Sequence, residues 1–509
     1  MSTSRTVEET PPGPPEDEPA RSPSPPRPTL PAWLPFLAGS LAMLAVGGYR
    51  LTAVSLDWDE GATVSASGRP VPEILGLAGH VDGVIAPYYL FLHFWTRVFG
   101  SSDLALRAPS LIAMALGVGL VAELGRRLIG PATGLVAGLI CAAIPALSYY
   151  SAQARPYALA FALATLATLS LYRAVERPSW RRWCWYAGFL LAAGVVHILA
   201  ATVLVAHLII VAGRWYAGRD RALLRALPAS AVTAVALAPL AVLGAREQQV
   251  QLAWVTSPTW RDVAAAPEQV VQSAQVAFLL VGLALVATVV LRRRTAAELV
   301  VLAVVPVGLM LLVSLAVPVW VPRYGTFALG PLAILAAGTV TAPARPSAGT
   351  LPRVALRATV VLALIAVEAL PAQILARQSH SSPDSRGLAG VIEANVAPGD
   401  GLVFGDFAWS LRPTVEHYLA RHSWTAPDAA PRDLLLTRDA GRLGSLDAQE
   451  CADVAACLGT TPRIWLVTPV SPAHPIDAAT SKMHALRARY AVTATWAKDQ
   501  GMVSLLVRR

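Results

Sequence analysis

The sequence predicts a mainly α-helical, polytopic membrane protein with a small α/β domain at its C-terminal end. Of its 509 residues, 55% are hydrophobic and only 14% are charged, whereas soluble domains carry about 25% charged residues. Apolar stretches recur from residue 32 to residue 372, and a transmembrane helix needs about 20 apolar residues. Beyond residue 373 the pattern changes to short alternating helices and strands. We therefore expect a transmembrane domain over 31–372 and an extracytoplasmic α/β domain over 373–509.

The first 30 residues form a tail rich in Pro, Ser and Glu, which includes the run Pro11-Pro12-Gly13-Pro14-Pro15. Such a composition cannot bury a core, so we expect a disordered cytoplasmic tail over 1–30. No small-residue cleavage site follows the apolar stretch 33–49. This stretch is therefore predicted to be a retained span and not a removed signal peptide.

The apolar stretches predict eleven spans, with twelve or thirteen as an alternative. Basic clusters between the stretches support the count of eleven, because positively charged loops remain in the cytoplasm. With a cytoplasmic N-terminus, the clusters at 126–127, 173–182, 214–225, 292–294 and 345–357 all lie inside. The expected spans are 32–49, 106–125, 131–150, 157–173, 183–196, 198–213, 226–245, 268–291, 297–317, 325–341 and 354–372.

The aromatic stretch 87–99 does not fit this count, because a full span there would reverse the side of every later loop. We expect an interfacial or partly embedded helix, with a further span as the alternative. The topology places four segments outside the plasma membrane, together with the C-terminal domain: 50–105, 150–156, 246–267 and 318–324. The net charge of +9 comes from clusters of the kind found in cytoplasmic loops. It therefore indicates contact with membrane lipids and not with nucleic acid.

The C-terminal part contains no Gly-rich phosphate loop and no nucleophile elbow. Cys451 and Cys457 lie close together in this part. A disulfide between them suits an extracytoplasmic domain, and two free thiols are the alternative. Helices are expected at 387–395, 410–419 and 479–490, and strands at 401–404, 463–467, 491–496 and 502–507.

Three carboxylates lie within four residues of the first outer loop, in the run Leu56-Asp57-Trp58-Asp59-Glu60-Gly61. Carboxylates are costly in lipid, and near it they usually belong to a functional site. A solvated loop or a helix cap is the structural alternative. Other outer segments also carry polar and aromatic side chains where a plain loop needs none, so we expect these segments to share one site.

The acidic run begins a series of motifs that extends to residue 324. The motifs are Asp59-Glu60, Pro87-Tyr88-Tyr89-Leu90-Phe91-Leu92-His93, Ser102-Asp103-Leu104-Ala105-Leu106-Arg107-Ala108-Pro109-Ser110, Gly125-Arg126-Arg127-Leu128, Tyr150-Ser151-Ala152-Gln153-Ala154-Arg155-Pro156-Tyr157-Ala158-Leu159, Val196-His197 and Pro322-Arg323-Tyr324. In order and spacing, this series resembles the GT-C membrane glycosyltransferases, specifically the bacterial family-39 group. That group includes the protein mannosyltransferases and the aminoarabinose transferase of lipid A. The match is good over 50–215 and thin from there to 340.

The resemblance implies a transmembrane bundle of the GT-C type that transfers a mannose-like hexose or a pentose with inversion. The implied donor is a polyprenyl-phosphate sugar, and lipid, glycan and protein acceptors remain open. Two departures from the group's pattern stand out: Gln153 replaces an acidic residue, and Ile85-Ala86 precede Pro87 where His or Asn is usual. The sequence therefore assigns no cofactor with certainty and leaves a divalent cation open.

Sugar transfer needs a base for the acceptor hydroxyl, and we expect Asp59 to be that base, with Glu60 tuning its pKa or orienting it. The leaving phosphate gains negative charge, so Arg155, Arg323 and His197 are expected to bind it. For His197, binding of the acceptor is an alternative. Snorkelling arginines and a packed histidine are the structural alternatives.

Other polar and aromatic residues of the outer segments are expected to line the pocket. The tyrosines among them also fit an interfacial aromatic belt. The Gln- and Trp-rich loop 246–262 fits sugar or lipid contact, with a surface amphipathic helix as the alternative. The expected pocket residues are Tyr88, Tyr157, Gln153, Asp82 and His80.

Two other classes of function compete with the enzyme. A transporter or lipid flippase should carry charges within its spans and show repeated halves, and neither feature is evident in the sequence. A membrane scaffold with an outer binding domain leaves the acidic run and the Arg-Pro-Tyr motif unexplained.

Overall fold

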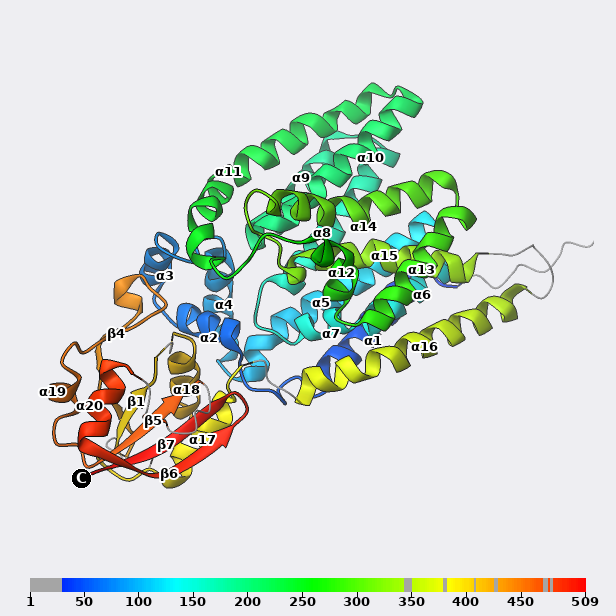
Figure 1. Cartoon of the computed structure of the whole chain (residues 1–509). Helices are drawn as coiled ribbons and strands as arrows, with labels where there is room; N and C mark the ends of the chain where they lie inside the picture. The colour runs from blue at the N-terminus through cyan, green and yellow to red at the C-terminus, as the bar shows by residue number, and fades with distance from the viewer. Residues whose placement is uncertain are drawn as a thin grey trace, which may run out of the picture. The chain divides into compact units, whose positions relative to one another are not determined.

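The computed structural model describes residues 30–342, 350–378, 382–406, 409–424, 429–469, 475–476 and 479–509. Residues 32–509 form one compact unit (Figure 1). The tail expected over 1–30 lies outside the described residues except for Leu30.

Most of the chain up to residue 378 is helical, and its long helices pack into a bundle (Figure 1). Three short 3-10 helices join or extend them: η1 (Ile198–Thr202), η2 (Arg221–Arg225) and η3 (Pro322–Ala328). The α-helices of the bundle are α1 (Leu34–Gly48), α5 (Asp103–Leu128), α6 (Pro131–Ala143), α7 (Pro145–Ser151), α8 (Tyr157–Glu176), α9 (Trp180–Val196), α10 (Val203–Gly218), α11 (Ala226–Gln251), α12 (Trp260–Val271), α13 (Ala274–Val290), α14 (Arg293–Ser314), α15 (Leu329–Thr341) and α16 (Thr350–Gln378).

Each expected span coincides with a helix or with a pair of helices. Among the described residues, seven helices are long and apolar enough to cross a membrane, or nine if two bent pairs each count as one span. The pairs are α6 with α7, bent by 67°, and α12 with α13, bent by 99°. Helix α1 has 15 residues and α9 has 17, fewer than the roughly 20 that a bilayer needs. The multi-pass prediction is confirmed, whereas the count of eleven spans is not.

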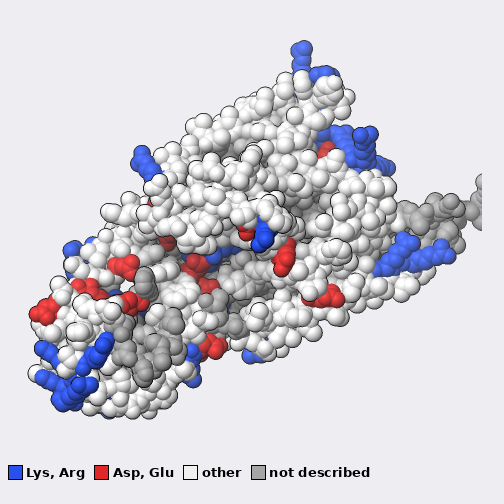
Figure 2. Space-filling view, in the orientation of Figure 1, with Lys and Arg blue, Asp and Glu red and all other residues white. Residues whose placement is uncertain are grey.

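The outer surface of the bundle is apolar, as lipid contact requires. Large side chains such as Phe278 and Val289, each 84% exposed, point away from the protein interior. Figure 2 shows little charge over the visible face of the helices and mixed charges over the C-terminal domain. Inside the bundle, small residues let helices approach closely: a Cβ on Gly39 of α1 would lie 3.2 Å from the Cα of Gly138 in α6.

The first loop folds into three short helices: α2 (Trp58–Ser67), α3 (Val71–Ala78) and α4 (Ala86–Phe99). Helix α4 is the stretch expected to be interfacial, and its 14 residues are too few for a full span. Asp57 caps α2 in a capping box, because its side chain accepts from the Glu60 N–H while Glu60 accepts from the Asp57 N–H. The cap makes Asp59 and Glu60 first-turn residues of α2.

The C-terminal domain contains a five-stranded sheet in the order β2-β1-β5-β7-β6, with β2, β1 and β5 parallel and β6 and β7 antiparallel. Successive side chains of a strand point to opposite faces. Accordingly, Leu402 and Phe404 pack with α17 and α18, whereas Val403 packs with α20. The elements are α17 (Ser385–Asn395), β1 (Gly401–Phe404), α18 (Leu411–Leu419), β2 (Arg432–Asp433), β3 (Leu436–Arg438), η4 (Gly441–Leu443), β4 (Gln449–Glu450), α19 (Val454–Leu458), β5 (Arg463–Thr468), α20 (Ser481–Arg489), β6 (Tyr490–Lys498) and β7 (Gly501–Arg508).

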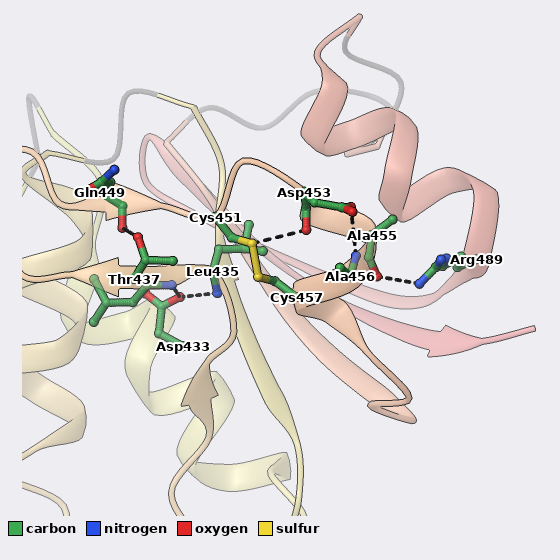
Figure 3. Close-up of a disulfide and its surroundings, with 11 residues drawn as sticks. Asp433, Leu435, Thr437, Gln449, Cys451, Asp453, Ala455, Ala456, Cys457 and Arg489 are labelled. Carbon is green, nitrogen blue, oxygen red and sulfur yellow. Dashed lines mark hydrogen bonds between the residues drawn. A yellow bond between two sulfur atoms is a disulfide. The ribbon is translucent and has the colours of Figure 1, made fainter.

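Cys451 and Cys457 form a disulfide with their Cα atoms 6.5 Å apart (Figure 3). The Cys451 N–H donates to the Leu435 carbonyl at 2.8 Å, beside the small β3–β4 ladder. The disulfide therefore joins this ladder to α19.

The C-terminal domain packs on α2 through α18. The Tyr418 hydroxyl accepts from the Leu56 N–H at 3.1 Å and donates to Asp103 at 3.0 Å. Asp103 also forms ion pairs with Arg421, at 2.8 Å, and with Arg386. A Cβ on Gly61 would lie only 2.1 Å from the Ser410 hydroxyl. The absence of a side chain at Gly61 therefore lets the C-terminal domain approach the acidic run closely.

Candidate active site

Glu60 is tied to a buried arginine and not to the open part of the site. Arg107 of α5 donates to both Glu60 oxygens, from Nε at 2.8 Å and from Nη2 at 2.6 Å. The Ala154 N–H also donates to Glu60 at 2.8 Å. The Glu60 side chain is 1% exposed and the Arg107 side chain 4%. Glu60 therefore anchors the first turn of α2, on which Asp59 also lies.

Asp59 points toward the second arginine of the predicted phosphate site. Its Oδ2 lies 3.2 Å from the Arg323 Nη1. Its backbone carbonyl accepts from the Arg155 Nη1 at 3.3 Å. Three residues that are far apart in the chain thus meet at the first turn of α2.

Arg155 is buried, and the first loop surrounds its guanidinium group. Its Nη1 donates to the Thr63 hydroxyl and to the Tyr89 hydroxyl, each at 3.4 Å. Tyr89 in turn donates to Asp82 at 2.6 Å. Asp82 has a φ of 57°, and Asp tolerates this left-handed conformation better than most residues. This chain of contacts fixes the cation that the sequence predicted as a phosphate ligand.

Asp57 and Gln153 form a direct pair. The Gln153 side-chain amide donates to the Asp57 Oδ2 at 2.7 Å. Both residues line the cavity beside Asp59. The amide at position 153 therefore serves as the hydrogen-bond partner of a nearby carboxylate.

A cavity of about 870 Å³ is lined by Asp57, Asp59, Gln153 and Arg155, among other residues. Its wall combines the first loop, the segment before α8, the end of α11 with the following loop, η3 and the C-terminal domain. Aromatic rings contribute much of the lining, and the volume accommodates a sugar and a phosphate. The lining includes Asp57, Trp58, Asp59, Asp82, Tyr149, Tyr150, Gln153, Arg155, Gln251, Trp254, Gln272, Arg323, Tyr324, Trp409, Ser445, Leu446 and Asp447.

The carboxylates of the cavity differ in acidity because their neighbours differ. Burial, together with the charges of Glu60 and Asp59, raises the pKa of Asp57 to about 7. Burial also acts to raise the pKa of Asp59, but the guanidinium groups of Arg155 and Arg323 outweigh it and hold that pKa below its ordinary value. Asp59 is therefore ionised at neutral pH, whereas Asp57 is close to half protonated.

His197 packs against two aromatic rings: its ring centroid lies 5.7 Å from that of Tyr157 and 4.8 Å from that of Tyr324. The Arg323 guanidinium carbon lies 5.7 Å from the centre of each of these two rings. Within the described part of the chain, three buried nitrogens here lack a hydrogen-bond partner: Arg155 Nε, Arg323 Nε and His197 Nδ1. Unsatisfied buried polar atoms are costly, so their gathering at one place suits a polar ligand.

Three of the expected pocket residues do not line the cavity: His80, Tyr88 and Tyr157. Tyr157 is buried beside His197, which was expected to bind phosphate and is also absent from the lining. His80 is exposed, and its Nδ1 lies 2.8 Å from the Gly76 carbonyl oxygen. Tyr88 is buried in the apolar core between the first loop and the C-terminal domain. Adjacent residues of a helix point to different sides, and Tyr89 occupies the side of α4 that faces Arg155 and Asp82. Tyr88 therefore points away from the cavity.

Several cavity residues were not predicted from the sequence. Trp58 follows the helix cap directly, and its position within the acidic run was the available signal. Trp409 and the segment 445–447 come from the C-terminal domain, where no motif marked them. Gln251 and Trp254, by contrast, belong to the Gln- and Trp-rich loop that was expected to contact sugar or lipid, and they line the cavity; Trp260 of the same loop is 75% exposed and does not. Among the described residues, no group of three His, Cys, Asp or Glu side chains is arranged to hold a metal ion.

Residues 86–244 match the family described as dolichyl-phosphate-mannose-protein mannosyltransferase. The fold matches ArnT from Cupriavidus metallidurans bound to undecaprenyl phosphate, with a TM-score of 0.57 at 14% identity, over 92% of this chain and 97% of that chain. The chain therefore has the fold of ArnT, and part of it resembles the mannosyltransferase family. The apo form of the same ArnT gives a TM-score of 0.56 at 15% identity, with the same coverage. No curated protein sequence matches the chain.

The fold shared with ArnT confirms the predicted fold class: a mainly helical transmembrane bundle of the GT-C type with a small α/β domain at the C-terminal end. The matched segment 86–244 includes α4 and Arg155 but begins after the acidic run. The contacts of Asp59 with Arg155 and Arg323 therefore come from the structure of this chain alone.

Proposed function

We propose that this GT-C glycosyltransferase moves a sugar from a polyprenyl-phosphate sugar to an acceptor hydroxyl, with inversion, and that Asp59 is the general base. The observation that carries the proposal is an ionised carboxylate 3.2 Å from a cavity arginine, within an 870 Å³ cavity beside an apolar helical bundle. The undecaprenyl phosphate bound to the structurally similar ArnT supports a lipid phosphate as the donor class.

In the proposed complex, Arg155, Arg323 and His197 bind the donor phosphate. Arg155 is held in place by Tyr89 and Thr63, so it needs little reorganisation to receive an anion. Arg323 is more accessible, with 25% of its side chain exposed. The unpartnered Nε atoms of both arginines and the His197 Nδ1 supply free hydrogen-bonding capacity.

The proposed reaction is a displacement at the anomeric carbon, with transfer of one proton. The acceptor oxygen attacks the anomeric carbon as the bond from that carbon to the phosphate oxygen breaks, and the phosphate leaves with the electron pair. The arginines stabilise the charge that develops on the phosphate. The acceptor hydroxyl proton passes to Asp59. The transition state resembles an oxocarbenium ion, as in glycoside hydrolysis.

The ion pair between Asp59 and Arg323 couples the base to the donor. Without the donor, Arg155 and Arg323 together lower the pKa of Asp59 and weaken it as a base. A donor phosphate competes for Arg323 and so releases the carboxylate, which raises its pKa toward the ordinary range. Asp59 becomes a stronger base only when the leaving group is already bound, and this order disfavours futile proton transfer.

The proposed topology places the cavity at the outer face of the plasma membrane. The disulfide between Cys451 and Cys457 supports an extracytoplasmic C-terminal domain, because disulfides persist in oxidising compartments. The helical part, 31–372, then carries the donor site, and 373–509 forms the outer domain. A lipid-linked donor suits this side because it can be flipped across the membrane.

The test is sugar transfer in membranes that express the wild type or Asp59→Asn, supplied with radiolabelled polyprenyl-phosphate sugars. Loss of a general base should lower transfer by roughly 10²- to 10⁴-fold. Asp439→Asn is the matched control, because Asp439 is an exposed carboxylate outside the cavity. Equal transfer by the wild type and by Asp59→Asn would refute the role of Asp59. Absence of transfer from every polyprenyl donor would refute the donor class and favour a transporter.

A further inference from the structure

We propose that Trp58 and Trp409 form the acceptor site and that the acceptor is a carbohydrate. The inference rests on the proposed function and deepens it, because it selects one acceptor class from lipid, glycan and protein. It concerns the part of the cavity wall that Trp58 and the C-terminal domain contribute, which the proposed donor site does not use.

The two indole rings come from different parts of the chain and face the same cavity. Trp58 is the first residue of α2, and Trp409 lies just before α18. Their ring centroids are 6.1 Å apart with an interplanar angle of 32°. Each side chain is only partly buried, and both line the cavity. The pair therefore offers aromatic surface to a ligand instead of closing into the core.

The backbone around the pair is held firmly. The Ser410 hydroxyl donates to the Trp58 carbonyl at 2.7 Å. The Leu56 N–H donates to the Tyr418 hydroxyl on the other side of the acidic run. Because these bonds join α2 to α18, the two indoles belong to one preorganised wall, and a preorganised site loses less entropy on binding.

Polar groups beside the pair suit hydroxyl groups better than anions. Ser445, Leu446 and Asp447 continue the same wall, and Asp57 precedes Trp58. Carboxylates and hydroxyls accept hydrogen bonds from the hydroxyls of a ligand. A sugar ring presents an apolar C–H face to an indole and a hydroxyl edge to such acceptors. The carboxyl group of Asp447 and the partly ionised carboxyl group of Asp57 disfavour a phosphate-bearing acceptor at this wall.

The position of the wall fits the proposed chemistry. Trp58 is adjacent in sequence to Asp59, which is the proposed base. A sugar that stacks on Trp58 is therefore held close to the carboxylate that must take its proton. Effective catalysis requires this kind of positioning.

The inference can be tested by ligand binding, without turnover. The full chain in lipid nanodiscs is mixed with neutral tetrasaccharides of mannose, glucose, galactose or arabinofuranose, or with a Ser/Thr-rich peptide. Saturation-transfer NMR reports which probe binds. We expect at least one tetrasaccharide to bind and Trp409→Ala to weaken its binding roughly tenfold. Trp409→Phe should retain part of the affinity, and Trp260→Ala, at an exposed tryptophan outside the cavity, should retain all of it.

Failure of every tetrasaccharide to bind would overturn the inference, as would equal binding by the wild type and by Trp409→Ala. Preferential binding of the peptide would assign a protein acceptor instead. The proposed function is judged separately: Asp59→Asn should bind the tetrasaccharide while losing transfer, and Trp409→Ala should bind undecaprenyl phosphate as the wild type does. If the wild type and Trp409→Ala transfer sugar to the acceptor equally well, the proposed enzyme activity is retained and the proposed acceptor site is refuted.

Discussion

Breaking the ion pair between Glu60 and Arg107 should destabilise the protein and displace its proposed base. The pair is bidentate, and both side chains are almost completely buried. Arg107 also donates to the carbonyl groups of Leu51, Val54 and Ser55. One residue of α5 therefore holds both the acidic side chain and the backbone that leads into α2.

The magnitude follows from the burial of the charges. Removing one partner of a buried pair leaves an uncompensated charge, which costs about 3–5 kcal/mol. We expect this cost for Glu60→Gln and for Arg107→Met alone. The double variant removes both charges, so it should be no less stable than the less stable of the two single variants. The sum of the two single losses should therefore exceed the loss of the double variant by about 3 kcal/mol, which is the coupling energy of the pair. Displacement of Asp59 by about 1 Å should also lower transfer by roughly 10²-fold.

The assay is thermal unfolding of the purified chain in detergent at one scan rate, because unfolding of such proteins is commonly irreversible. Glu123→Gln is the control, since Glu123 pairs with Arg126 near the surface and such pairs contribute about 0–1 kcal/mol. Single variants that unfold at the wild-type temperature would refute the reasoning. A double variant whose loss equals the sum of the two single losses would also refute it.

Three further predictions concern the cavity and the disulfide. Arg323→Gln should raise the KM for the lipid-phosphate donor roughly 10- to 100-fold, because a charged hydrogen bond contributes about 1.5–3 kcal/mol, and an unchanged donor KM would exclude Arg323 from phosphate binding. The pKa of Asp57 is raised to about 7, so this carboxyl is protonated below that pH and ionised above it; donor binding measured across pH 5–9 should weaken as the pH rises through 7, and Asp57→Asn should abolish this dependence. Replacing Cys451 and Cys457 together by Ser opens a short loop and should destabilise the outer domain by about 2 kcal/mol in chemical unfolding, whereas wild-type stability would show that the disulfide contributes nothing.

The multi-pass helical architecture could be predicted because it depends on local properties. A span needs a run of apolar residues, and each helix satisfies its own backbone hydrogen bonds within the lipid. The bends were not predicted. Stretches 131–150 and 268–291 were treated as single spans, yet each contains a break. Pro145 was a visible signal for the first break, because the residue before a proline avoids the helical conformation.

The acidic run shows the limit of the sequence within the site. Asp57, Asp59 and Glu60 are close neighbours of the same chemical type, so their environments could not be told apart from the sequence. Their partners are distant: Glu60 meets Arg107, 47 positions away, and Asp57 meets Gln153, 96 positions away. The first contact buries Glu60 in an ion pair. Burial and the neighbouring carboxylates raise the pKa of Asp57, whereas Arg155 and Arg323 lower that of Asp59.

The sequence by itself determined that this protein crosses the membrane many times, that a carboxylate cluster follows its first apolar stretch and that arginines recur in later segments. Only the tertiary structure decided which carboxylate faces an arginine in an open cavity and which is buried in a pair. It also brought Trp409 to Trp58, across 351 positions of the chain. The physical reason is that hydropathy acts within one helix, whereas pairing, burial and acidity depend on distances that only the packing of distant segments sets.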